Sequence, residues 1–235
     1  MAEYLSDEEQ IDRLKRLIRQ YGSSALTGIL LALIAYFGWT YWQKRELANQ
    51  ALLSGKYQEV VDASKNAQAD STDVGARTRF LASASTLVKD NPDSAYAYQT
   101  LLLEARLAAD RQDFTAAEKA LMSASQIKLD DQGLQQMALT RLARVQLQLG
   151  KNDAALATVK KVTLPSFIPS AAELQGDIEL LKNDQTAAKK SYQTAWDALA
   201  KRQQPRQLLK VKMEALGMTV ADVKVPSPIR DEVAS

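Results

Sequence analysis

The uncharged run over residues 22–42 is the feature that most limits how this chain can fold. Its 21 residues contain no acidic or basic side chain. As a helix the run would extend about 31 Å, close to the hydrocarbon thickness of a bilayer. It ends in bulky aromatic residues followed by Lys44 and Arg45, whereas a cleaved signal is usually shorter and ends in small residues. We therefore predict an uncleaved, single transmembrane helix. A cleaved signal and a soluble core helix are the alternatives.

The basic residues on either side of this run indicate its orientation. Those before it are Arg13, Lys15, Arg16 and Arg19, and those after it are Lys44, Arg45 and Lys56. Four basic residues against three favour an N-terminus in the cytoplasm. The sequence therefore predicts a short cytoplasmic segment over 1–21, a membrane span over 22–42, and the rest of the chain on the opposite side.

One face of the predicted span carries small residues four positions apart, namely Ser24, Gly28 and Ala32. Small side chains at this spacing allow another transmembrane helix to approach closely. Small residues are also common on helix faces that only contact lipid. The sequence thus predicts a candidate packing face in the membrane, with lipid contact as the alternative.

Two residue types that carry much of enzyme chemistry, cysteine and histidine, are absent from the 235 residues. Their absence excludes disulfides, cysteine nucleophiles, histidine bases and the commonest metal ligands. The 30 basic and 28 acidic residues nearly balance, so no strong attraction to nucleic acid is expected. We predict a non-enzymatic protein without a cofactor or a metal site. A membrane-bound hydrolase that uses carboxylates is the alternative.

Beyond Arg45 every long segment has the composition of a helix. Alanine and leucine dominate, prolines fall at breaks, and no stretch shows the two-residue alternation of a strand. We predict a long helix over 44–70 that pairs with a helix over about 75–89. A short helix over 206–216 and a flexible tail are predicted within 201–235.

Three segments between residues 101 and 200 repeat a helix–turn–helix pattern with small residues at fixed positions. The alanines after the turns are Ala117, Ala155 and Ala188, spaced 38 and 33 residues apart. Twelve positions before these alanines stand Ala105, Ala143 and Gly176. Helices pack closely only where side chains are small. The pattern resembles the tetratricopeptide repeat, with its period of ~34 residues. It predicts an all-α, tetratricopeptide-like α-solenoid of helix pairs over 43–200, with an irregular helical bundle as the alternative.

The resemblance to tetratricopeptide repeats implies a concave face lined by the first helix of each pair. In the register of that family, the lining residues are Gln99, Leu102, Arg106, Met137, Thr140, Arg144, Leu147, Glu173, Asp177 and Leu180. Arg106 and Arg144 occupy equivalent positions and are candidates to bind carboxylates or backbone carbonyls of an extended peptide. The alternative is that both are solvated arginines without a specific role.

The order of these features resembles a known family. The segment "EEQIDRLKRLIRQYG", the span exit "GWTYWQ" and the phrase "LARVQLQLGKNDAALATV" are similar to the YfgM family of bacterial inner-membrane proteins, the ancillary subunits of the SecYEG translocon. The resemblance covers about residues 8–200. It implies a cytoplasmic N-terminus, a periplasmic repeat domain, and two partners: SecYEG and the membrane-anchored periplasmic isomerase-like chaperone PpiD.

The function that the resemblance implies is that of a non-catalytic inner-membrane adaptor. Such an adaptor would help periplasmic chaperones to receive newly translocated proteins, with translocating polypeptides as its clients. The alternative is a tetratricopeptide-like scaffold for another inner-membrane envelope complex. The chain beyond Lys201 has no counterpart in the resemblance, so nothing is inferred for it.

Overall fold

The computed structural model describes residues 7–70, 72–221 and 223, without the side chains of residues 7–10, 12–14, 16–18, 22–25 and 29. These residues divide into two compact units, Met1–Gly55 and Lys56–Ser235. No strand occurs in the described ranges, so the prediction of an all-α chain is confirmed. Most of the tail predicted after the last helix, residues 224–235, lies outside the described residues.

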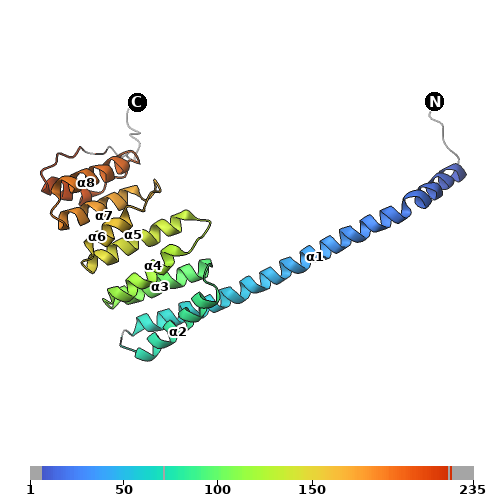
Figure 1. Cartoon of the computed structure of the whole chain (residues 1–235), viewed down its shortest axis with the longest axis horizontal. Coiled ribbons are helices and arrows are strands. Elements are labelled where there is room, and N and C mark those ends of the chain that lie inside the picture. Colours follow the sequence, from blue (N-terminus) through green and yellow to red (C-terminus); the bar gives the residue numbers. More distant parts are fainter. Residues whose placement is uncertain (1–6, 71, 222, 224–235) are drawn as a thin grey trace, which may run out of the picture. The chain divides into compact units, whose positions relative to one another are not determined.

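Nine helices follow one another in the described part of the chain (Figure 1). They are α1 (Asp7–Ala69), α2 (Val74–Asp90), α3 (Ala95–Asp110), α4 (Phe114–Gln126), α5 (Gln132–Gln148), α6 (Asn152–Val159), α7 (Ile168–Leu181), α8 (Gln185–Ala200) and α9 (Gln207–Ala215). The helices predicted over 75–89 and 206–216 are confirmed as α2 and α9. The helix predicted over 44–70 is the end of α1, which is continuous from Asp7.

In the first unit, α1 presents its described apolar side chains to solvent. Leu30 is 56% exposed and Trp39 is 64% exposed, and at ~100° per residue these two side chains point to opposite sides of the helix. Within the described residues, no helix is both long and apolar enough to cross a membrane. The predicted span includes residues 22–25 and 29, whose side chains lie outside the described ones.

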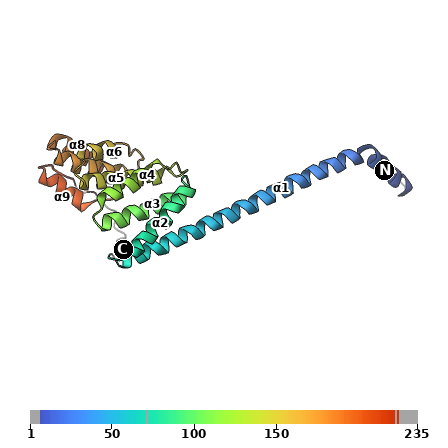
Figure 2. The same cartoon turned by 60° about the horizontal axis from the view of Figure 1, so that its bottom comes forward.

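In the second unit, α3 pairs with α4, α5 with α6, and α7 with α8, and the pairs stack in chain order (Figures 1 and 2). Ahead of them, the last turns of α1 pack beside α2 and α3. Nζ of Lys56 lies 3.4 Å from Oδ2 of Asp90 at the end of α2, and the rings of Tyr57 and Tyr96 are 5.1 Å apart between their centroids. The helix pairs that the repeat pattern predicts are therefore present.

The turns inside the three pairs share one backbone conformation. Each turn has three residues, and its middle residue has a positive φ: 62° at Gln112, 70° at Gly150 and 61° at Asn183. The next N–H then donates to the carbonyl five residues earlier, at 2.9 Å in all three turns. This bond is the signature of a helix end closed by a left-handed residue. The repeated sequence pattern therefore reflects a repeated turn, although only one of the three positions is glycine.

The small positions of the repeats are where the helices touch. The buried small residues are Ala105, Ala143 and Gly176 in the first helices and Ala117, Ala155 and Ala188 in the second helices. A Cβ added at Gly176 would lie 2.5 Å from Cε1 of Tyr192, so only glycine fits beneath that ring. The prediction that small residues mark close helix contacts is confirmed.

Helix α9 closes the end of the stack. Its residues Leu209 and Met213 are fully buried and pack in one cluster with Tyr192 and Trp196 of α8. The predicted repeat domain ends at residue 200. Helix α9 instead extends the packed core beyond it, because two apolar residues four positions apart form a stripe that covers the last pair.

Candidate peptide-binding groove

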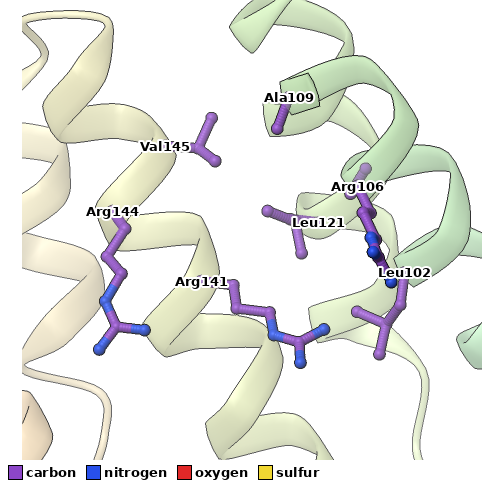
Figure 3. Close-up of a pocket in the computed structure, with 8 residues that line it drawn as sticks. Leu102, Arg106, Ala109, Leu121, Arg141, Arg144 and Val145 are labelled. Carbon is purple, nitrogen blue, oxygen red and sulfur yellow. The ribbon is translucent and has the colours of Figure 1, made fainter. Parts of the chain in front are cut away.

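A pocket of about 460 Å³ opens between α3, α4 and α5 (Figure 3). We call it the arginine pocket; it is lined by Leu102, Ala105, Arg106, Ala109, Leu121, Arg141, Arg144 and Val145. Three of the residues predicted to line a concave face, Leu102, Arg106 and Arg144, come together here. Arg106 and Arg144 lie on opposite sides of the pocket, with Leu121 of α4 between them.

A second pocket of about 450 Å³ lies between α5, α7 and α9. We call it the acidic pocket; it is lined by Arg144, Ser170, Glu173, Leu174, Asp177, Arg206 and Leu208. It brings Arg144 together with two further predicted positions, Glu173 and Asp177. Arg144 lines both pockets, and we refer to the two together as the groove; their lining includes residues of α3, α5 and α7, the first helix of each pair.

The arginine pocket carries positive charge that the protein itself barely neutralises. Nε of Arg106 lies 3.8 Å from Oδ2 of Asp110, with both side chains more than half exposed. Among the described residues, Arg141 and Arg144 form no ion pair. Tyr98 of α3 donates a hydrogen bond of 2.7 Å to the carbonyl of Leu134, which ties α3 to the start of the α5 segment. Burial raises the pKa of this Tyr98 hydroxyl, and the positive charge of Arg141 opposes the rise.

In the acidic pocket, both carboxylates are already paired with cations. The cations are Lys212 of α9 and Arg206, the residue immediately before α9. Glu173 accepts from Nη1 of Arg206 at 2.5 Å and from Nζ of Lys212 at 3.0 Å. Asp177 accepts from Nζ of Lys212 at 2.8 Å and from the hydroxyl of Tyr192 at 2.7 Å. Burial by itself would raise the pKa of Glu173, but the hydrogen bonds from Arg206 and Lys212 outweigh it and lower the pKa. These acids therefore hold α9 against α7.

The other predicted groove residues line neither pocket. Gln99 is exposed, and Met137 is half-buried. Thr140 is buried and donates to the carbonyl of Gln136 at 2.8 Å. Leu147 and Leu180 are half-buried and pack against the hydrophobic core.

Sequence reasoning missed Arg141, Val145, Ala109 and Leu121. The signal for Arg141 was its position three residues before Arg144, which places both on one side of α5. Nothing in the sequence indicated Leu121, because it belongs to the second helix of its pair and reaches the pocket only through tertiary packing.

The predicted packing face of the membrane span is described only in part. The side chain of Ser24 lies outside the described residues. Ala32 is exposed, and a Cβ added at Gly28 would meet nothing within 4 Å. At these two described positions the helix surface is open.

The groove has the properties of a binding surface. Guanidinium groups at its rim are suited to bidentate contacts with carboxylates, and the apolar floor is suited to an aliphatic side chain. An all-helical stack of pairs with such a face defines a tetratricopeptide-like solenoid protein. In agreement, residues 15–218 match the family described as a tetratricopeptide repeat-like domain. The chain belongs to that family.

Proteins similar in sequence narrow the family to which the chain belongs. A protein named ancillary SecYEG translocon subunit from Haemophilus influenzae is 32% identical, over 92% of this chain and 100% of the relative. Proteins of the same name from Aggregatibacter actinomycetemcomitans and Escherichia coli are each 30% identical, over 92% and 84% of this chain and 100% and 89% of the relatives. No solved structure matches the chain significantly. The chain is therefore a member of the ancillary SecYEG translocon subunit family, as the resemblance found in the sequence predicted.

Proposed function

We propose that this protein is a non-catalytic adaptor associated with the SecYEG translocon. The observation that carries the proposal is its similarity, over 92% of the chain, to a protein named as an ancillary subunit of that translocon. The fold supports an adaptor, because a stack of helix pairs offers an extended concave surface for binding other chains.

In this proposal α1 anchors the protein in the bacterial inner membrane through residues 22–42. Support comes from the exposed apolar side chains that surround α1, such as Leu30, Leu31 and Trp39. A helix that is apolar on all sides requires either a protein core or a lipid environment. The basic residues around the run favour an N-terminus in the cytoplasm and helix pairs in the periplasm.

The adaptor would help periplasmic chaperones to receive newly translocated polypeptides, with PpiD as the chaperone partner that the resemblance implies. Anchoring supports this role, because a tethered groove near the channel exit meets emerging chains at a high effective concentration. Weak contacts in the groove would then be sufficient. The alternative is a scaffold for another inner-membrane envelope complex.

Photo-cross-linking in native membranes tests the proposal. A photoreactive amino acid at position 28 or 32 should yield adducts with channel subunits, because both positions are exposed on the small-residue face of α1. The same photoreactive amino acid at Met122, an exposed residue of α4, serves as the comparison, because in this proposal α4 lies in the periplasm. Adducts with other inner-membrane proteins and none with the channel would contradict the proposal and favour the scaffold.

A further inference from the structure

We infer that the arginine pocket binds an extended peptide segment in which acidic residues alternate with an aliphatic residue. The inference names the ligand class of the groove and so rests on the proposed adaptor function. It depends on the charges, the floor and the geometry of the pocket.

The charges of the pocket favour an anionic ligand. Arg141 and Arg144 are exposed and form no ion pair with any described residue. Among the described residues, Arg106 forms an ion pair only with Asp110, one helical turn away, at 3.8 Å. A pair this exposed contributes little to stability, so Arg106 is free to exchange it for a closer carboxylate. Three guanidinium groups at one rim favour a ligand that carries more than one negative charge.

Among the described residues, Asp110 pairs with Arg106, and no acid forms an ion pair with Arg141 or Arg144. Glu173 and Asp177 line the acidic pocket together with Arg144. Both are satisfied by other donors: Arg206 and Lys212 for Glu173, and Lys212 for Asp177. The positive charge of Arg144 is therefore left for a ligand in the neighbouring pocket.

The floor of the pocket favours an aliphatic group. Ala105 and Leu121 are buried beneath it, and Leu102 and Val145 form half-buried walls. The alanines of α3 create the depth, because a single methyl group leaves space that a longer side chain would fill. A volume of about 460 Å³ lies within the range of pockets that enclose compact ligands.

The arrangement of charge around the floor favours an extended segment. Arg106 stands on one side of Leu121, and Arg144 stands on the other, on α5 (Figure 3). An extended chain places every second side chain on the same face. A segment of the form acid–x–aliphatic–x–acid would direct its central side chain to Leu121 and its two acids to the opposite arginines.

Fluorescence anisotropy with the full-length protein in detergent micelles tests the inference. The probe is a labelled peptide, Gly-Glu-Ala-Leu-Ala-Glu-Gly, and two matched peptides replace either both glutamates by glutamine or the leucine by serine. The first peptide should bind most tightly, and its affinity should fall with added salt because exposed charges are screened. Equal binding of the glutamine peptide would overturn the inference.

Variants of the pocket connect binding to this site. Arg141→Gln and Arg144→Gln should each weaken binding of the acidic peptide about tenfold, as expected for the loss of one charge-assisted hydrogen bond. Arg79→Gln removes the same charge from an exposed position of α2 outside the pocket and should leave binding unchanged. Ala109→Leu keeps every charge but fills the pocket, and should also weaken binding.

The controls separate this inference from the proposed function. Helical circular dichroism and the thermal transition show whether each variant is folded. If no peptide binds, the peptide site is refuted. Cross-linking to channel subunits from position 28 would still stand in that case, because it depends on α1 and not on the pocket. If the cross-links are absent while the peptide binds, the adaptor proposal fails alone.

Discussion

Tyr192 and Gly176 show how a single residue sets the spacing of a helix pair. Tyr192 is fully buried, and its hydroxyl donates to Asp177, so the ring cannot move aside. Its ring lies directly against the backbone of α7 at Gly176. The repeat pattern identified Gly176 as a small position, and the structure supplies the reason why alanine does not fit there.

The first prediction follows from this contact. Gly176→Ala should lower the free energy of unfolding by about 1–2 kcal/mol, because overpacking typically costs ~1–3 kcal/mol and exceeds the gain of up to ~1 kcal/mol in helix propensity. Gly55→Ala in α1 is the matched control: nothing lies within 4 Å of a Cβ at that position, so the variant should be stabilised by about 0.5–1 kcal/mol. Urea unfolding followed by circular dichroism measures both. A stabilised Gly176→Ala variant would contradict the prediction and show that the Tyr192 ring moves to make room for the added methyl group.

Arg111 supports a second prediction at the same scale. Its Nη2 donates to the carbonyl of Ala67 at 3.1 Å, in the last turn of α1, where carbonyls lack a helical partner. A cation at a helix C-terminus also interacts favourably with the helix dipole. Arg111→Met should therefore lower the free energy of unfolding by about 1–2 kcal/mol, measured by the same urea titration.

A control of equal charge isolates the role of the Arg111 contact. Arg79→Met removes an exposed arginine whose nearest acid, Asp73, lies 3.8 Å away. It should change the free energy of unfolding by less than about 0.5 kcal/mol. Equal losses in the two variants would mean that the contact with Ala67 is not stabilising.

The helices could largely be predicted from the sequence. The side chains that meet between different helices were harder to predict. Small residues at fixed spacing, such as Ala117 and Ala155, must face another helix, and this constraint predicts the pairs directly. The turns after α3 and α7 were recognisable by their polar residues. In contrast, the arginine pocket depends on which side chains of α4 and α5 contact α3. The spacing of residues along one helix does not determine these contacts between helices. Arg144 was therefore predicted and Leu121 was not.

Helix α9 illustrates the same limit. The bounds of α9 were predictable from its sequence. Its packing was not, because the helix is short and only partly apolar. Glu173 and Asp177 were predicted as groove residues because they lie on the correct face of α7. They do lie there, yet both are bound by Lys212. A short cationic helix that docks on acids of the groove becomes visible only when the chain has folded back.

The docking of α9 carries a pH prediction. The pKa of Glu173 is lowered from its ordinary value of 4.5, so its ion pairs stabilise the folded state above that value. As the pH falls through the lowered pKa, Glu173 binds a proton and this contribution is lost. Glu173→Gln should therefore be less stable than the wild type by about 1–2 kcal/mol at pH 7, and the difference should approach zero in acid. Urea unfolding at pH 7 and about pH 3 measures it.

The control is the equivalent change at Glu214, a half-exposed acid of α9. Oε1 of Glu214 lies 3.9 Å from Nζ of Lys210, and the Glu214 side chain is half exposed. Glu214→Gln should differ from the wild type by less than about 0.5 kcal/mol at either pH. A Glu173→Gln deficit that persists unchanged in acid would indicate lost packing instead of a lost ion pair.

At the scale of the whole molecule, the proposed function requires that α1 anchor the protein in the membrane. The wild type should stay with the membrane pellet in alkaline carbonate. Leu30→Arg combined with Ile34→Arg places two charges one helical turn apart in the apolar run. At ~2.5–3.5 kcal/mol per arginine, the two charges oppose insertion by about 5–7 kcal/mol, and the variant should appear in the supernatant.

A matched pair of substitutions on the same helix makes this test specific. Leu47 and Leu52 are also exposed, but they lie beyond the uncharged run. Leu47→Arg combined with Leu52→Arg adds the same charge and should remain in the pellet. A phosphatase fused after Ser235 should be active only when that end of the chain is outside the cytoplasm. Carbonate extraction of the wild type, or an inactive phosphatase fusion, would contradict the anchored topology, because an adaptor at the channel exit must hold its groove on the side where chains emerge.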